Sequence, residues 1–251
     1  MVDPIPTRTR LATGARAIAR DEGLRAYMLR VYNLMASGVL LTGIFAIMGY
    51  RVEAIRQLLY HEVVTPYGVS LGLTGLGWIV TLAPLGIVLA LSFGRRIRPQ
   101  TAGLLFWVFA ALMGLSLSSI FFVFTGVSIA RTFFVTAAAF GALSLYGYTT
   151  KRDLSGFGTF LFMGLVGIIL AAVVNLFIRS TMMDFVISAV GVLVFAGLTA
   201  YDTQRLKDIY YEVAGDVTAA KRSAIMGALA LYLDFINLFL MLLRFMGQTR
   251  D

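Results

Sequence analysis

Long runs of apolar residues dominate the chain, and short polar or charged segments separate them. A helix needs about 20 mostly apolar residues to cross the hydrocarbon of a bilayer. Runs of that length predict seven transmembrane helices, at 28–50, 74–94, 102–124, 128–148, 157–178, 182–202 and 224–246. The pattern therefore predicts an all-α integral membrane protein, with a seven-helix transmembrane domain over 28–247.

Residues 1–27 form a separate basic segment. The segment has no uninterrupted apolar stretch followed by a small-residue cleavage site, which a cleaved signal peptide would require. Two alternatives stay open for it: a basic stretch that lies on the cytoplasmic membrane surface, or a partly disordered tail.

Composition supports lipid as the solvent and excludes several kinds of chemistry. Hydrophobic residues make up 59% of the chain and charged residues only 14%, against about 25% charged in a soluble domain. Cysteine is absent and His61, expected in a solvated outer loop, is the single histidine, which excludes disulfides, thiol catalysis and zinc sites that need two imidazoles. In such a chain the formal charge of +8 indicates loops facing anionic lipid, so we expect membrane lipid as a partner and no nucleic acid.

The distribution of lysine and arginine predicts the orientation. With the N-terminus in the cytoplasm, 15 of the 21 basic residues fall on the cytoplasmic side. Cytoplasmic loops carry an excess of lysine and arginine, so we expect a cytoplasmic N-terminus and an outer C-terminus.

Polar residues within the apolar runs are the candidates for function, because a charge at the membrane centre costs about 2.5–3.5 kcal/mol on insertion scales. Asp234 lies in the middle of the last run, and Asn237, three residues on, shares its helix face. Asp202 ends the sixth run, where it lies either at the headgroup level or, if the helix continues, within the bundle. Asn175 is a candidate for a hydrogen bond between helices.

Two carboxylates brought together in a bundle of low dielectric constant cannot both ionise cheaply, and they tend to share one proton. Loss of that proton forces two negative charges apart or attracts a cation between them. Calcium prefers oxygen ligands such as carboxylates. If Asp202 and Asp234 meet, the pair therefore predicts a proton-sensitive cation path.

Three stretches resemble signatures of the transmembrane Bax inhibitor motif family, the first of them its bacterial branch in particular. They are GYTTKRDLSGFG (147–158), TAYDTQRLK (199–207) and ALALYLDFINLFLMLLR (228–244). The resemblance covers roughly residues 25–247. It implies a fold in which six helices surround a central C-terminal helix.

The resemblance also implies a pH-sensitive calcium leak gated by Asp202 and Asp234, which would be the calcium ligands too. It implies that an arginine after the second helix, here Arg95 or Arg96, pairs with the first aspartate in the open form. Arg244 matches another arginine of the family, near the end of the last helix. A bacterial relative carries a glutamate in its second helix, whereas 74–94 contains no acidic residue.

The main functional hypothesis is accordingly a pH-sensitive calcium leak channel of the bacterial inner membrane, with calcium as a permeant ion and no tightly bound cofactor. The alternative is a membrane regulator without transport, which binds a membrane quality-control protease. An intramembrane aspartyl protease is disfavoured because the GlyXaaGlyAsp pattern is missing around both aspartates, so we expect no enzyme. The sequence leaves the oligomeric state open.

Overall fold

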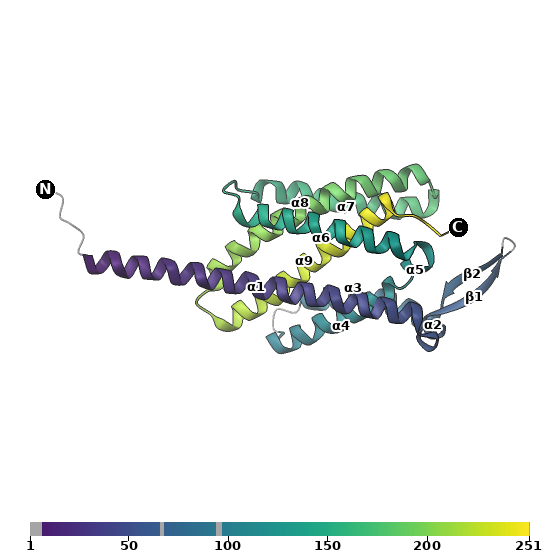
Figure 1. Cartoon of the computed structure of the whole chain (residues 1–251), viewed down its shortest axis with the longest axis horizontal. Helices are drawn as coiled ribbons and strands as arrows, with labels where there is room; N and C mark the ends of the chain where they lie inside the picture. The colour runs from purple at the N-terminus through teal and green to yellow at the C-terminus, as the bar shows by residue number, and fades with distance from the viewer. Residues whose placement is uncertain (1–6, 66–67, 94–96, 251) are drawn as a thin grey trace.

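The computed structural model describes residues 7–65, 68–93 and 97–250 of the chain. Its elements, in chain order, are α1 (Thr7–Arg51), α2 (Glu53–Leu59), β1 (Tyr60–Thr65), β2 (Gly68–Leu73), α3 (Gly75–Phe93), α4 (Pro99–Leu117), α5 (Ile120–Val123), α6 (Gly126–Thr149), α7 (Ser155–Ile178), α8 (Thr181–Val213) and α9 (Val217–Met246) (Figure 1).

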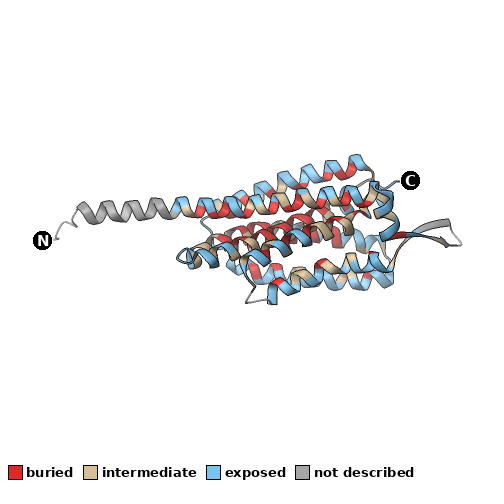
Figure 2. Ribbon diagram, turned by 90° about the horizontal axis from the view of Figure 1, so that it is seen from below, coloured by how far each residue is buried: buried red, intermediate tan, exposed pale blue. Residues whose placement is uncertain are grey.

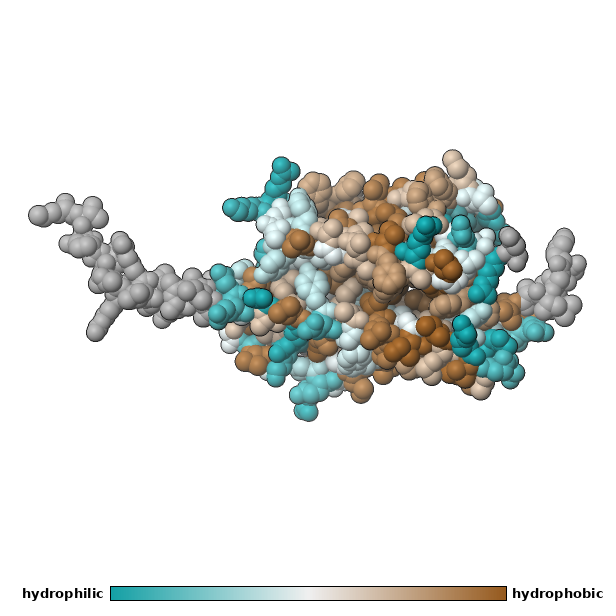
Figure 3. All heavy atoms as spheres, viewed as in Figure 1, coloured by the Kyte–Doolittle hydropathy of each residue, from teal (hydrophilic) through white to brown (hydrophobic). Residues whose placement is uncertain are grey.

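Seven helices in the described ranges are long and apolar enough to cross a membrane, which confirms the predicted number of spans. They coincide with the seven apolar runs, and α5 extends the third span to Val123. Their outward faces carry large apolar side chains, such as Leu40, Phe134 and Phe177, that water would not solvate well. Hydrophobic residues accordingly fill the middle of the face in Figure 3, and hydrophilic ones gather toward its two ends. The protein is an all-α, multi-pass membrane protein.

The last span, α9, is the most buried. Within its most apolar window 56% of the residues are buried, against 17–33% in the other spans. It packs against α1, α4, α6 and α8, whereas α3 packs mainly on α4, and α7 packs on α8. Buried residues accordingly concentrate on the inward faces of the helices (Figure 2). The expected ring of six helices around α9 is not confirmed.

Small residues let the helices approach closely where a side chain would collide. A Cβ atom on Gly147 of α6 would lie 2.2 Å from the carbonyl oxygen of Ala200 in α8, and one on Gly114 of α4 would lie 2.4 Å from that of Thr42 in α1. Membrane helices associate through such close packing because lipid supplies no hydrophobic driving force between them. Buried hydroxyl groups add hydrogen bonds: the hydroxyls of Thr42 and Tyr232 lie 2.7 Å apart, linking α1 to α9.

Segments predicted to lie on one side of the membrane gather at one end of the bundle. The backbone N–H of Thr125 donates to the carbonyl of Gln248, and Arg250 donates to the hydroxyl of Tyr50. At the opposite end, Tyr27 of α1 donates to Ser223 of α9. These contacts agree with the predicted alternation of the spans. Which end faces the cytoplasm stays a prediction.

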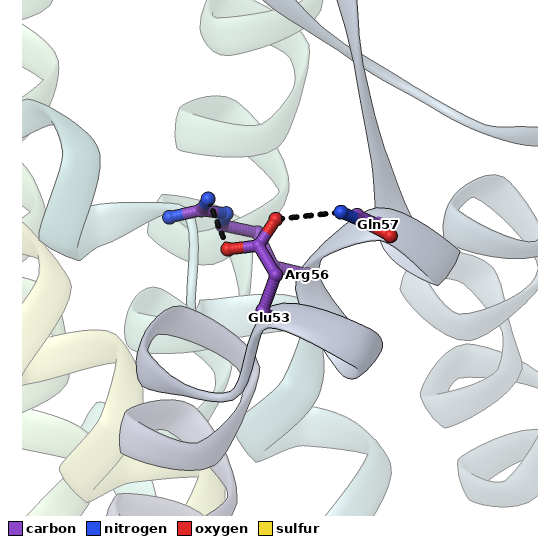
Figure 4. A network of polar contacts seen from close by, with 3 residues as sticks. All are labelled: Glu53, Arg56 and Gln57. Atoms are coloured by element: carbon purple, nitrogen blue, oxygen red, sulfur yellow. Dashed lines mark hydrogen bonds and ion pairs between the residues drawn. The ribbon is translucent and has the colours of Figure 1, made fainter.

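A small antiparallel hairpin, β1 and β2, is an element that the sequence analysis did not predict. It pairs Tyr60 with Leu73 and follows the short helix α2. His61 is exposed, as predicted, but it lies on the strand β1 and not in a loop as predicted. In α2, Glu53 accepts hydrogen bonds from Arg56 and Gln57 (Figure 4), as expected of a solvated polar turn.

The ends of α1 and α8 differ most from the predicted runs. Helix α1 begins at Thr7, so the backbone of the basic N-terminal segment continues into the first span without interruption. Helix α8 continues to Val213, eleven residues beyond Asp202. Asp202 therefore lies inside a helix and not at its end.

Candidate functional site

Asp202 of α8 and Asp234 of α9 face each other, and their carboxyl groups lie within side-chain hydrogen-bonding reach. Helices α8 and α9 run antiparallel as neighbours, which brings two residues 32 positions apart to the same level. Asp234 is 5% exposed and Asp202 is partly buried. Asp202 and Asp234 thus meet, which is the condition on which the predicted proton-sensitive cation path depended.

The pair is not fully satisfied by hydrogen bonds. The Oδ2 atom of Asp234 is buried and has no hydrogen-bond partner among the described residues. An unsatisfied buried polar atom costs about 1–3 kcal/mol. Such a cost at a site of this kind points to function rather than to stability, because structural polar groups in a membrane are normally paired.

Both aspartates line one cavity of about 1110 Å³. Its walls come from α3, α4, α7, α8 and α9. The cavity lies between α3, which packs on α4, and α7, which packs on α8, and both α4 and α8 pack on α9. The cavity runs from Ala230 to Arg244 along α9, which is about 21 Å at 1.5 Å per residue. That length is about two-thirds of a hydrocarbon core roughly 30 Å thick.

Exposed arginines mark the two ends of this cavity. Arg244 lies at the end farther from the aspartates. Arg205 lies at the nearer end, one turn beyond Asp202 on α8, and its charge acts on the Asp202 carboxyl. Arg205 was not among the predicted site residues, although its spacing of three residues from Asp202 was the available signal.

Two further predicted cations belong to a part of the chain that the structure does not describe. Arg95 and Arg96, proposed as partners of Asp202, lie outside the described residues. Arg98, the described cation after them, is the residue before the first turn of α4 and does not line the cavity.

Other polar side chains extend the site along α9 and α3. Asn237 lines the cavity one turn beyond Asp234, and its amide nitrogen donates to the carbonyl of Leu233, which leaves its oxygen available. Thr81 and Pro84 line the cavity from α3. Proline has no N–H, so Pro84 cannot bond the carbonyl of Val80, which belongs to the same helix face. The helix that lacks an acidic residue thus still offers neutral oxygens.

A close packing contact positions the α8 side of the site. A Cβ atom on Gly158 of α7 would lie 2.5 Å from the ring of Tyr201, the residue before Asp202. Gly158 belongs to the 147–158 stretch and Tyr201 to the 199–207 stretch. Two of the three stretches that carry the resemblance therefore meet beside the aspartate pair.

Asn175 serves a structural purpose away from the pair. Its amide nitrogen donates to Asp184 of α8 at 2.7 Å and to the carbonyl of Ser180, which ties the end of α7 to the start of α8. The predicted hydrogen bond between helices is confirmed.

The described residues contain no group of three or more histidine, cysteine, aspartate or glutamate side chains that could hold a metal ion. Calcium takes six to eight oxygen ligands, whereas this site supplies two carboxylates and a few neutral oxygens. The donor set therefore suits a weakly held or passing cation better than a resident one.

Residues 24–251 match the family model described as inhibitor of apoptosis-promoting Bax1. The chain belongs to this family. It is 49% identical over 242 residues to an uncharacterized protein of Rickettsia prowazekii, which covers 96% of this chain and 97% of the relative. It is 47% identical over 232 residues to the inner membrane protein YbhL of Escherichia coli, covering 91% and 94% of the two chains, and 41% identical over 226 residues to an uncharacterized protein of Borreliella burgdorferi, covering 90% and 93%. The predicted family is confirmed.

Proposed function

We propose that this Bax inhibitor family protein is a pH-sensitive cation leak of the bacterial inner membrane, with calcium as the permeant ion. The meeting of Asp202 and Asp234 in a cavity along α9 is the observation that carries the proposal. The printed name of the Escherichia coli relative supports the inner membrane, and the charge bias supports a cytoplasmic N-terminus.

In the closed state the two carboxyl groups share one proton, which removes the repulsion between them. Loss of that proton leaves two negative charges that repel each other. Helix α9 cannot move away from α8 without entering the packed core. The repulsion is relieved if Asp202 turns toward Arg205 at the near end of the cavity, or if a cation enters between the carboxylates. Arg205 is the partner of Asp202 in this proposal, and the pairing of Asp202 with Arg95 or Arg96 stays a prediction.

A calcium ion that enters the cavity would meet both carboxylates and the Asn237 oxygen, and then the Thr81 hydroxyl on α3. Neutral oxygens there replace the acidic residue that the second span lacks. The walls at the two sides of the cavity are each held mainly by one neighbouring span, because α3 packs mainly on α4 and α7 packs on α8.

Purified protein in liposomes loaded with a calcium-sensitive dye tests this proposal. We expect calcium flux to increase as the pH rises, and to lose its pH response in Asp202→Asn and in Asp234→Asn. Asp184→Asn is a matched control, because Asp184 lies on the same helix as Asp202 but outside the cavity. Flux that is insensitive to pH, or unchanged in both cavity variants, would refute the leak.

Liposomes that contain no other protein also separate the leak from the regulator hypothesis. A chain that passes no calcium in them, yet captures a membrane protease whether or not Asp234 is replaced by asparagine, would be a regulator. Loss of that capture on deletion of residues 1–24 would identify the basic segment as its docking surface.

A further inference from the structure

A second groove lies on a different side of the bundle, between α1 and α6. It has a volume of about 540 Å³ and shares no lining residue with the cavity of the aspartate pair. Helix α1 packs on α4, α8 and α9, and α6 packs on α8 and α9, so these two spans flank the groove. Its lining consists of Arg25, Met28, Leu29 and Tyr32 from α1, and of Phe140, Gly141, Ser144, Leu145 and Tyr148 from α6.

The spacing of these residues shows that each helix contributes one continuous face. The four residues of α1 follow the i, i+3, i+4, i+7 pattern of a single helix face. At 1.5 Å per residue the groove is about 10–12 Å long. Half of a hydrocarbon core roughly 30 Å thick is about 15 Å, so the groove spans most of one leaflet and does not cross the membrane.

Two cations lie at one end of the groove: Arg25, which lines it, and Lys207, which lies beside the lining residue Tyr148. Arg25 is exposed at that end of α1. Lys207 of α8 donates to the carbonyl of Tyr148 at 2.5 Å and lies 5.2 Å from the centre of its ring. An ammonium group has three donors, so Lys207 keeps further donors for another acceptor. Tyrosines favour the membrane interface, where a ring is apolar on one side and a hydroxyl meets polar groups.

The middle of the groove is open and apolar. A Cβ atom on Gly141 would meet no other atom within 4 Å. Phe140 beside it packs edge-to-face on Phe235 of α9, with ring centres 5.5 Å apart, and so anchors this part of the groove to the core. In a membrane, a gap of this kind between two spans borders on the acyl chains of lipid.

We propose that this groove binds an anionic phospholipid from the leaflet on the side of Arg25. One acyl chain lies along Leu29, Gly141 and Leu145, and the phosphate lies at Arg25 and Lys207. The length of one leaflet, the apolar middle and the two cations at one end are the features of such a lipid. The proposal does not depend on the proposed leak.

Lipid titrations on the detergent-solubilised full chain, followed by native mass spectrometry, test this inference. The probes are phosphatidylglycerol and phosphatidylcholine with the same acyl chains. One basic residue near the surface contributes a factor of about five in binding of anionic lipid. We therefore expect phosphatidylglycerol to bind at least about fivefold more tightly than phosphatidylcholine, and Arg25→Gln to remove about fivefold from the former alone.

Gly141→Leu fills the open middle of the groove, and we expect it to weaken retention of both lipids. Gly167→Leu is the matched control, because Gly167 is also an exposed glycine of a transmembrane helix whose Cβ would meet nothing within 4 Å. Equal affinity for the two lipids, an unchanged Arg25→Gln variant, or equal behaviour of the two leucine variants would overturn the proposal. Arg25 is a surface side chain, so its variant tests the headgroup contact even if Gly141→Leu does not fold.

Discussion

Replacement of Asp234 by leucine is expected to stabilise the protein while it abolishes the proposed leak. Asp234 is 5% exposed, and its Oδ2 atom has no partner among the described residues. Leucine has the same number of side-chain heavy atoms and the same branching as aspartate, and it has no polar atom to satisfy. The substitution thus removes a buried polar cost and adds apolar burial at the same place. It also takes the Asp234 carboxyl away from Asp202, but Asp202 is only partly buried and keeps the charge of Arg205 beside it.

The size of the effect follows from the single unpaired oxygen. Its removal recovers about 1–3 kcal/mol. In a chain of this length each kcal/mol shifts Tm by about 2–4 °C. A gain of about 2 kcal/mol therefore raises Tm by about 4–8 °C. Native proteins tolerate such a cost where activity requires it.

Thermal unfolding of the detergent-solubilised protein at neutral pH, followed by the fluorescence of Trp78 and Trp107, measures this shift. Asp184→Leu is the control with the opposite sign, because Asp184 accepts a hydrogen bond from Asn175 and lies in the first turn of α8. Loss of this hydrogen bond should lower the free energy of unfolding by about 1 kcal/mol. A Tm of Asp234→Leu at or below that of the unchanged protein would show that the carboxyl pair is not a cost, and would refute the reasoning.

Two further predictions concern packing and the connection between α6 and α7. Gly147→Val should destabilise the protein by about 1–3 kcal/mol, because its Cβ would lie 2.2 Å from the carbonyl oxygen of Ala200. Gly167→Val is the control and should cost less, because a Cβ atom on Gly167 would meet no other atom within 4 Å. Equal losses of Tm in the two variants would contradict the packing argument. The N–H of Ser155 donates to Asp153 at 2.8 Å and holds the pKa of that carboxyl below its ordinary value. Because the pKa is lower in the folded state, this contribution is present at neutral pH and is lost as the pH falls through the folded value. As the pH is lowered from about 5 to about 3, the Tm of Asp153→Ala should therefore fall less than the Tm of the unchanged protein. An identical fall of Tm in the two proteins would contradict this.

The hairpin of β1 and β2 is an element that long apolar runs do not predict. Residues 60–73 are too polar to span a membrane and too short to form a domain, so the predicted topology treated them as part of an outer loop. The signal was present in the sequence, as β-branched residues on either side of the tripeptide Pro66-Tyr67-Gly68, whose proline and glycine favour a turn. Local turn chemistry therefore predicts this element better than hydropathy does.

For the candidate site too, the sequence predicts one aspartate more clearly than the other. Asp234 stands out in the sequence because apolar residues surround it for two turns on either side. Asp202 does not, because a sequence cannot show whether a helix ends at a charged residue or continues as α8 does to Val213. Arg205 becomes relevant only once Asp202 is known to line a cavity.

By itself, the sequence determined the solvent, the number of spans and the one residue whose charge lipid would not tolerate. Those properties depend on the length and hydrophobicity of continuous segments, which local composition expresses. Only the tertiary structure decided that Asp202 meets Asp234, that α3 and α7 flank a cavity, and that α1 and α6 leave a second groove. These depend on which helix faces pack together, and lipid-facing and protein-facing surfaces of a membrane helix are equally apolar, so their sequences do not distinguish them.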